Sequence, residues 1–173
     1  MIRRCNTDDA SIVDTILEVI NESAQAYAGL IPADCYHEPY MSRDYLMSEI
    51  RAGVVFFAYY GNDTMLGVMG MQYKLFLSLI RHAYVRTDHR GQGIGTNLLR
   101  YLLEMTDKPV LIGTWEAAAW AISFYQKQGF SPVSEAEKNQ LLDKYWNISK
   151  PHKLASVVLA DARYPEAAKK LLA

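Results

Sequence analysis

Residues 84–99 limit the choice of fold more than any other part of this sequence, because they combine a strand, a glycine-rich turn and a helix. Three glycines, Gly91, Gly93 and Gly95, follow a run of β-branched and aromatic residues, and leucines then recur at helical spacing. Backbone N–H groups at a helix start lack intrahelical partners, and the helix dipole there favours anions. Glycines also allow a ligand to approach the backbone closely. The segment is therefore typical of a loop that binds phosphate.

The spacing of these glycines differs from that of the common nucleotide-binding loops. A Walker loop requires Gly-Lys followed by Ser or Thr, which is absent, and a dinucleotide fingerprint requires G-x-G-x-x-G in an opening βαβ unit. A kinase glycine loop has the same G-x-G-x-x-G spacing and lies between two strands. The string from Arg90 to Gly95, RGQGIG, fits the pattern Q/R-x-x-G-x-G/A instead.

Periodicity along the chain predicts one α+β domain over residues 1–173, with three layers and a mixed, largely antiparallel, twisted sheet flanked by helices. A first helix is expected after a cap at Asn6 or Thr7, and a structured loop or broken helices over 21–40. Ser134 and Glu137 have the spacing of a capping box. The further helices are expected at 42–52, 93–103, 117–128 and 134–146, and the strands at 54–60, 66–73, 75–86, 110–115 and 154–160.

Composition and charge argue against several classes of function. The formal net charge is −1 with scattered Lys and Arg, whereas sequence-independent nucleic-acid binding needs a concentrated basic face. Cys5 and Cys35 lack the spacing of a disulfide framework or a zinc site, and no spacing of His, Cys, Asp and Glu suggests a metal. No secretory segment is expected, and the longest apolar run, 54–60, is too short to span a bilayer. A cytoplasmic protein without nucleic-acid or membrane partners is expected.

Two segments resemble the GNAT superfamily of acetyl-CoA-dependent N-acetyltransferases. The first is the loop from Arg90 to Gly95, which in that family binds the coenzyme pyrophosphate. The second, residues 115–130, is similar to the family block N-x-x-A-x-x-F-Y-x-K-x-G-F. The expected order of elements over residues 2–133 also resembles the GNAT order, with the helix near 134–146 and the strand near 154–160 as additions. The resemblance implies the GNAT fold and acetyl-CoA as the co-substrate.

The same resemblance implies roles for individual residues. Main-chain groups of residues 83–85 would pair with the pantetheine amides, and the N–H of Val85 would stabilise the oxyanion. The hydroxyl of Tyr125 would protonate the departing thiolate as a general acid. The coenzyme-binding residues implied are Ala83, Tyr84, Val85, Arg90, Gly91, Gln92, Gly93, Ile94, Gly95, Thr96, Phe124, Tyr125 and Lys127.

Two positions depart from the family pattern. Ala118 stands where many relatives carry an asparagine that helps to hold the pantetheine arm, and Leu79 stands where some keep a catalytic glutamate. The general base must therefore lie elsewhere, act through water, or be unnecessary. Glu116, at the end of a strand, is the first candidate. Arg81 and His82 are expected on opposite faces of their strand, because side chains alternate there.

The activity implied is direct transfer of the acetyl group to a primary amine, without a covalent enzyme intermediate. A small-molecule amine is favoured as acceptor, because the aromatic and polar segment 27–40 would close over a cleft. The acceptor-binding residues expected are Tyr36, His37, Glu38 and Tyr40, and the further base candidates are Glu22, Asp34, His37 and Glu38. Two alternatives stay open: assembly as a homodimer, and a non-catalytic acyl-CoA-binding or sensing module that keeps the glycine loop without the chemistry.

Overall fold

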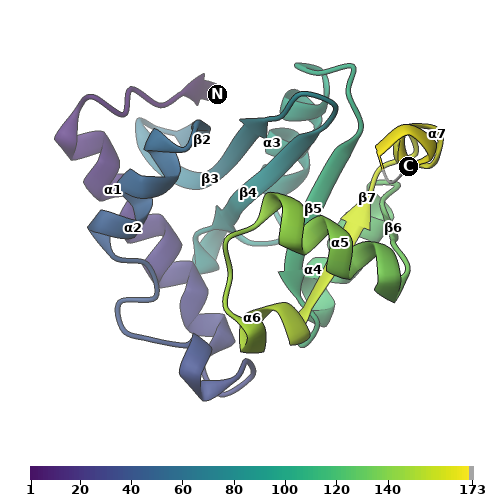
Figure 1. The fold of residues 1–173 in the computed structure, drawn as a ribbon. Helices are drawn as coiled ribbons and strands as arrows, with labels where there is room; N and C mark the ends of the chain where they lie inside the picture. The colour runs from purple at the N-terminus through teal and green to yellow at the C-terminus, as the bar shows by residue number, and fades with distance from the viewer. Residues whose placement is uncertain (172–173) are drawn as a thin grey trace. The chain divides into compact units, whose positions relative to one another are not determined.

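The structure, a computed structural model, describes residues 1–171 (Figure 1). The described chain forms two compact units, and each of them combines segments that are distant in sequence. The first unit contains residues 1–26, 37–73 and 80–107, and the second contains residues 27–36, 74–79 and the chain from 108 onward. The expectation of a single acetyltransferase domain over residues 1–173 stays a prediction.

The first unit is a sheet with helices on both faces. Its strands are β1 (Ile2–Arg4), β2 (Val54–Gly61), β3 (Thr64–Tyr73) and most of β4 (Ser78–Val85), in the order β1-β2-β3-β4. β2 pairs antiparallel with both β1 and β3. In Figure 1, α1 (Ala10–Ala24) and α2 (Arg43–Arg51) lie in front of these strands and α3 (Ile94–Leu103) lies behind them. Apart from β1, which was not predicted, these elements agree with the strands and helices expected from periodicity except at their ends.

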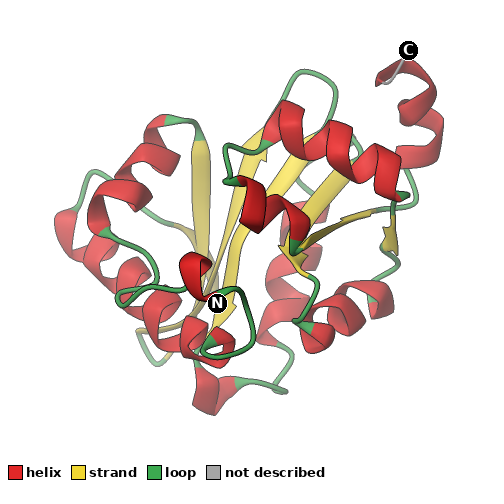
Figure 2. Cartoon of the chain, turned by 60° about the horizontal axis from the view of Figure 1, so that its bottom comes forward, coloured by secondary structure: helices red, strands yellow, loops and turns green. Residues whose placement is uncertain are grey.

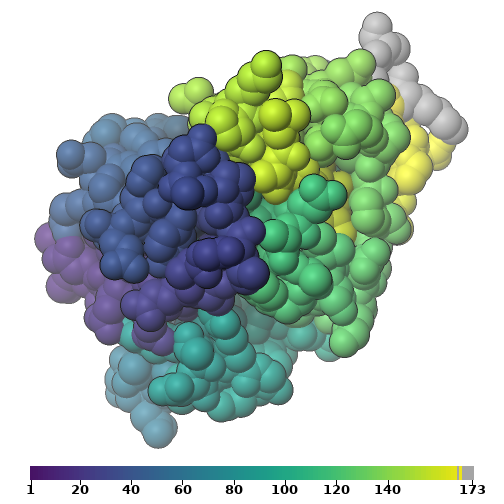
Figure 3. Space-filling model, turned by 90° about the horizontal axis from the view of Figure 1, so that it is seen from below, coloured from purple at the N-terminus to yellow at the C-terminus, as the bar shows by residue number. Residues whose placement is uncertain are grey.

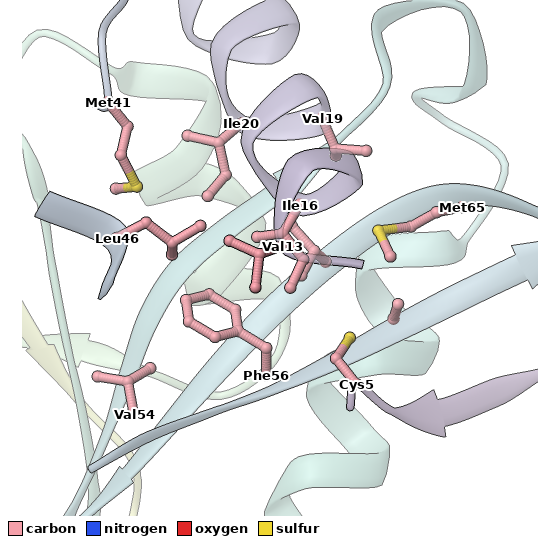
Figure 4. Close-up of a cluster of buried hydrophobic side chains, with 12 residues drawn as sticks. Cys5, Val13, Ile16, Val19, Ile20, Met41, Leu46, Val54, Phe56 and Met65 are labelled. Carbon is pink, nitrogen blue, oxygen red and sulfur yellow. The ribbon is translucent and has the colours of Figure 1, made fainter. Parts of the chain in front are cut away.

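Alternation along β2 gives the first unit its two apolar faces. Phe56 is fully buried against α1 and α2 (Figure 4), whereas the ring of Phe57 lies 5.8 Å from that of Tyr101 in α3. A buried side chain of this kind contributes roughly 1.5–3 kcal/mol to folding. The cluster under α1 and α2 consists of Cys5, Val13, Ile16, Val19, Ile20, Met41, Leu46, Val54, Phe56, Ala58, Met65 and Val68. It fixes the C-terminal turn of α1 next to the sheet.

The first helix begins later than the sequence predicts. Its cap is Asp9, whose carboxylate accepts a hydrogen bond from the N–H of Ser11 over 2.9 Å. The prediction of a cap at Asn6 or Thr7 is therefore wrong. Asn6, Thr7 and Asp9 are all residue types that favour helix caps. Which of them caps the helix depends on how the apolar repeat that starts at Ile12 packs on the sheet.

β4 differs from its predicted form at its start and at His82. It begins at Ser78, because Lys74 and Leu77 close a turn in which the N–H of Lys74 donates to the carbonyl of Leu77 over 2.9 Å. Further along, His82 has a φ of +50°, which interrupts the alternation of side chains. Arg81 and His82 consequently both reach the same carboxylate oxygen of Glu49, at 2.5 and 2.7 Å. Their predicted placement on opposite faces is wrong.

The second unit has its own antiparallel strands, β5 (Val110–Trp115), β7 (Ser156–Ala160) and β6 (Ser131–Pro132), in the order β5-β7-β6. Its helices are α4 (Ala119–Lys127), α5 (Glu135–Tyr145), α6 (Lys150–Leu154) and α7 (Tyr164–Leu171). The 3₁₀ helix η2 (Ala33–Cys35) belongs to this unit, and η1 (Gln25–Tyr27) runs up to it along the chain. Figure 2 shows α7, which was not predicted from the sequence, next to the mark for the C-terminus.

Aromatic side chains organise the second unit. Trp146 lies on β5 where a Cβ at Gly113 would be only 3.2 Å from the indole, so a larger residue there would push the indole away. Leu79 is completely buried in the cluster of this unit, with Leu77, Leu111 and residues of α5 and β7. The predicted capping box of Ser134 and Glu137 is confirmed at the start of α5.

Two further points follow from the described residues. The strand predicted over 154–160 begins at Ser156, because Lys150–Leu154 forms the short helix α6 instead. Among the described residues, no helix is both long and apolar enough to cross a membrane.

Candidate functional site

The glycine loop leaves β4 and leads into α3. Gly91 and Gly93 have φ values of +76° and +80°, which L side chains rarely adopt, and a Cβ built on either one meets no atom within 4 Å. Gly93 caps α3, and no described side chain caps that helix end. No described side chain therefore pairs with the first-turn N–H groups at the positive end of the helix dipole, an arrangement that favours an anion.

The loop is fastened to the end of β4 and to α1 by hydrogen bonds within the first unit. The guanidinium of Arg90 donates to the carbonyl oxygens of Ser23, at 2.8 Å, and Val85, at 3.4 Å. The hydroxyl of Ser23 donates to the same Val85 oxygen over 3.0 Å. Arg90, expected from the sequence to bind the coenzyme, is thus engaged with backbone carbonyls. The structure brings Val85 and Arg90 together with Ser23, which was not predicted from the sequence.

Arg86 forms a second attachment of β4 to α1. Its guanidinium donates to Glu22 at 2.5 Å and to Glu18 at 2.8 Å, and the other Glu22 oxygen accepts from the N–H of Thr87 at 3.1 Å. Burial would lower the pKa of Arg86, but the bonds to the two carboxylates raise it. Because its carboxylate is already shared between two donors, Glu22 is poorly suited to be the general base.

Tyr125 lies in α4 of the second unit and is 5% exposed. Its ring is in edge contact with Phe124 at 5.0 Å and Phe130 at 6.0 Å, which fixes its orientation. Burial, with a smaller contribution from Tyr27, raises the pKa of the Tyr125 hydroxyl above its usual range. The hydroxyl therefore keeps its proton at neutral pH, as a general acid must.

The other predicted residues of the second unit differ in exposure. Phe124 is half-buried, whereas Lys127 is exposed near the end of α4. Ala118 is buried at the start of α4 and gives that helix no side-chain cap. Glu116 has an exposed side chain, and its backbone N–H donates to Ala155 over 2.9 Å.

The four predicted acceptor residues are divided between the units. Tyr36 belongs to the second, and His37, Glu38 and Tyr40 belong to the first. His37 and Glu38 are exposed, and Tyr40 packs against the buried cluster under α1 and α2. The space-filling view shows the dark blue part of the chain that contains this segment at the surface (Figure 3). The structure thus leaves the polar side chains accessible and anchors the segment through an aromatic residue.

A third group of polar residues joins Arg81 and His82 to Glu49, which was not predicted from the sequence. Glu49 of α2 lies in contact with Arg81 and His82 of β4, and all three side chains are largely buried. Glu49 and His82 are 33 residues apart, so no local spacing could relate them. Among the residues that the structure describes, no group of His, Cys, Asp and Glu is placed to hold a metal ion.

Residues 51–132 match the family model described as an acetyltransferase (GNAT) domain. This stretch contains β2, β3, β4, the glycine loop, α3, β5 and α4. Over these residues the chain is similar to a GNAT acetyltransferase domain, which confirms the resemblance to the GNAT superfamily. A search of curated proteins gave no significant match.

Solved structures are similar over most of the chain. A PaiA N-acetyltransferase from Thermoplasma acidophilum in complex with coenzyme A has 18% identity and a TM-score of 0.69, covering 93% of this chain and 97% of that chain. A GNAT-family acetyltransferase from Staphylococcus aureus has 16% identity and a TM-score of 0.67, covering 93% and 98%. A ribosomal-protein-alanine N-acetyltransferase from Escherichia coli has 15% identity and a TM-score of 0.65, covering 93% and 92%. The predicted GNAT fold is confirmed by these neighbours.

Proposed function

We propose that this protein transfers the acetyl group of acetyl-CoA directly to the primary amine of a small molecule. The observation that carries the proposal is the uncapped start of α3, where two open glycines in the left-handed conformation expose backbone N–H groups. The pyrophosphate of the coenzyme is the ligand of this loop in the family. The neighbouring structure with coenzyme A bound supports the same assignment.

The chain's own residues then have the following roles. The amine nitrogen forms a bond to the thioester carbonyl carbon while the backbone N–H of Val85 stabilises the developing oxyanion. The carbon–sulfur bond breaks, the sulfur takes the electron pair, and Tyr125 donates its proton to that sulfur. A base removes the proton that the amine nitrogen loses. Solvent restores the Tyr125 proton.

A cationic small amine is the acceptor that the aromatic residues favour. Tyr27 stacks on Trp120 with ring centroids 5.9 Å apart, and Trp120 is 45% exposed. Ammonium groups bind to such aromatic faces. We assign acceptor binding to His37, Glu38 and Tyr40, which all belong to the first unit.

Thiol release from acetyl-CoA tests the proposal. A panel should contain alkylamines, polyamines, arylamines and short peptides with free N-termini, with the acetylated product identified by mass. We expect release with small primary amines and little release with the peptides. Product from peptides alone would change the acceptor class. Binding of acetyl-CoA without release for any amine would favour the non-catalytic acyl-CoA-binding module, which the buried Leu79 in place of a glutamate would then explain.

A further inference from the structure

A chain of hydrogen bonds connects α2, β3 and β4 in the first unit. The side-chain amide of Gln72 donates to the carbonyl of Ala52 over 2.9 Å and accepts from the guanidinium of Arg81 at 3.3 Å. Arg81 donates onward to a Glu49 oxygen at 2.5 Å, and that oxygen lies 2.7 Å from Nε2 of His82. The chain of bonds therefore ends on an imidazole.

The carboxylate decides which ring nitrogen of His82 carries the proton. An ionised carboxylate only accepts hydrogen bonds, so Nε2 must be the donor, and in the neutral imidazole Nδ1 is then left as an acceptor. Among the described residues, no hydrogen bond to Nδ1 is present. This is the arrangement in which a carboxylate orients a histidine as a general base.

The surroundings of His82 keep its imidazole neutral. Its ring stacks on Phe56 of β2 at 6.0 Å and meets the edge of Tyr45 of α2 at 6.3 Å, and its side chain is 12% exposed. Burial lowers the pKa of His82, and the charge of Arg81 lowers it further, against the opposite effect of Glu49.

The other titratable groups around the ring favour the same state. Burial alone would raise the pKa of Glu49, but the hydrogen bond from His82 and the charge of Arg81 together lower it, so Glu49 is ionised. Burial raises the pKa of Tyr45, so its hydroxyl is neutral. At neutral pH the group therefore contains a cation, an anion and a neutral imidazole able to accept a proton.

The backbone at His82 directs this imidazole next to the strand residues assigned to the coenzyme. His82 directly precedes Ala83, Tyr84 and Val85, and its φ of +50° turns the side chain to the face that Glu49 occupies. Histidine is among the few side chains enriched at positive φ. The strand therefore carries a side chain that can act as a base at His82 and the backbone N–H of the proposed oxyanion site at Val85, three residues later.

We propose that His82 is the general base of the acetyl transfer and that Glu49 positions it. This inference rests on the proposed function and names the base which that function leaves open. A proton passes from the ammonium form of the acceptor to Nδ1 of His82, and the neutral amine then forms the nitrogen–carbon bond and loses its second proton to water. The carbon–sulfur bond breaks and the thiolate takes its proton from Tyr125. The imidazolium afterwards releases its proton to water, so the enzyme returns to its starting state.

His82→Gln tests the base directly, because the glutamine amide can still donate to Glu49 but cannot accept a proton. For an alkylamine, we expect kcat/KM at neutral pH to fall about 10²-fold, the lower end for general base catalysis. For an arylamine, which is already neutral, we expect a much smaller fall. The dissociation constant for acetyl-CoA should not change. Equal losses for both amines would mean that the histidine has only a structural role, which would overturn the inference.

The pH profile gives a readout that a structural role would not move. Below the imidazole pKa, which lies under the ordinary value of about 6.5, the slope of log kcat/KM against pH for the wild type should increase by one. His82→Gln should lack this increase. Glu49→Gln should move it to lower pH, because removing the carboxylate charge lowers the pKa of the imidazole. An increase that is unchanged in both variants would overturn the proposal.

Chemical rescue covers the case in which glutamine disturbs the fold. His82→Gly suits a residue with positive φ, and added imidazole should restore part of its turnover with alkylamines. If the wild type acetylates no amine at all, the proposed function fails before His82 is tested. If the wild type is active and all His82 variants match it in rate and pH profile, only this inference fails, and Glu116→Gln becomes the next variant to measure.

Discussion

The hydroxyl of Ser23 donates a hydrogen bond to the carbonyl oxygen of Val85 over 3.0 Å, which connects the end of α1 to the end of β4. The carbonyl of Ser23 in turn accepts from Arg90 in the glycine loop at 2.8 Å. One residue of α1 thus fixes both the last residue of the strand and the first residue of the loop. Packing of α1 on the sheet thereby determines where the loop backbone is presented.

Ser23→Ala should weaken this attachment. Loss of one hydrogen bond to a partly buried carbonyl lowers the free energy of unfolding by about 1 kcal/mol, and a looser Val85 should raise the acetyl-CoA dissociation constant severalfold. Denaturant unfolding and calorimetry measure the two effects. Ser48→Ala is the matched control, since that hydroxyl donates at 2.7 Å only to Tyr45 within its own helix. Unchanged coenzyme binding in the Ser23 variant would contradict the link between α1 and the loop.

Gly93→Ala should abolish acetyl-CoA binding. A methyl group at φ +80° strains the backbone by about 1–3 kcal/mol and occupies the open space next to the exposed N–H groups. Acetyl-CoA at about 100 times its dissociation constant should stabilise the wild type by about 2.7 kcal/mol. Gly53→Ala has the same strain at φ +94° with equally open surroundings, and it should keep the rise in melting temperature. A normal rise in the Gly93 variant would be evidence against a pyrophosphate at this loop.

Tyr125→Phe should lower turnover about 10²-fold and leave acetyl-CoA binding unaltered. The change keeps the ring contacts with Phe124 and Phe130 and removes only the proton donor. Because burial raises the pKa of Tyr125, wild-type turnover should show no loss from Tyr125 ionisation up to its ordinary pKa of about 10. Steady-state kinetics over this range decides the point, and equal turnover of the two proteins would mean that the thiolate leaves unaided.

Glu38→Gln should raise the acceptor's Michaelis constant for cationic amines without changing coenzyme binding. Glu38 is exposed, so its charge is available to an ammonium group. Glu104→Gln, which removes one exposed carboxylate at the end of α3, is the control for net charge. An equal effect of the two substitutions would move the acceptor site away from this segment. A neutral acceptor should respond to neither.

The two cysteines should differ in their reaction with thiol reagents. Burial raises the pKa of Cys5 to about 12, so it has almost no thiolate at neutral pH. Cys35 is less buried, and burial and Asp34 raise its pKa. Labelling of the native protein should modify Cys35 slowly, faster as pH rises, and Cys5 only after unfolding. Mass spectrometry of labelled peptides checks this order; rapid labelling of Cys5 would contradict its burial.

Regular elements were predictable where apolar periodicity is uninterrupted. β2 and β5 agree closely with the expected 54–60 and 110–115, and the capping box of Ser134 is where the pattern indicates. The glycine loop was recognisable because it needs residues at positive φ. Glycine favours that conformation, so its spacing in the sequence indicates such a loop. One prediction failed at the start of α1, where several neighbouring residues can all cap a helix. Another failed at His82, whose positive φ turns its side chain to the other face of the strand.

The polar contacts of the candidate site were less accessible to sequence reasoning. Ser23 and Val85 are 62 residues apart, and Glu49 and Arg81 are 32 apart. Such pairs form because α1 and α2 pack on the sheet through apolar side chains. The periodicity identifies those apolar side chains and says nothing of which polar neighbours they bring into contact.

The three tryptophans of the chain all belong to the second unit: Trp115, Trp120 and Trp146. Trp146 lies against Gly113 and Trp120 stacks on Tyr27, so their fluorescence reports the packing of that unit and not the glycine loop of the first. A melt followed by intrinsic fluorescence would therefore miss early loss of the first unit, whereas far-UV circular dichroism would detect it. Coincident transitions by the two probes would mean that the units unfold cooperatively. If the transitions do not coincide, a ligand-induced change in melting temperature measured by fluorescence alone describes only the second unit.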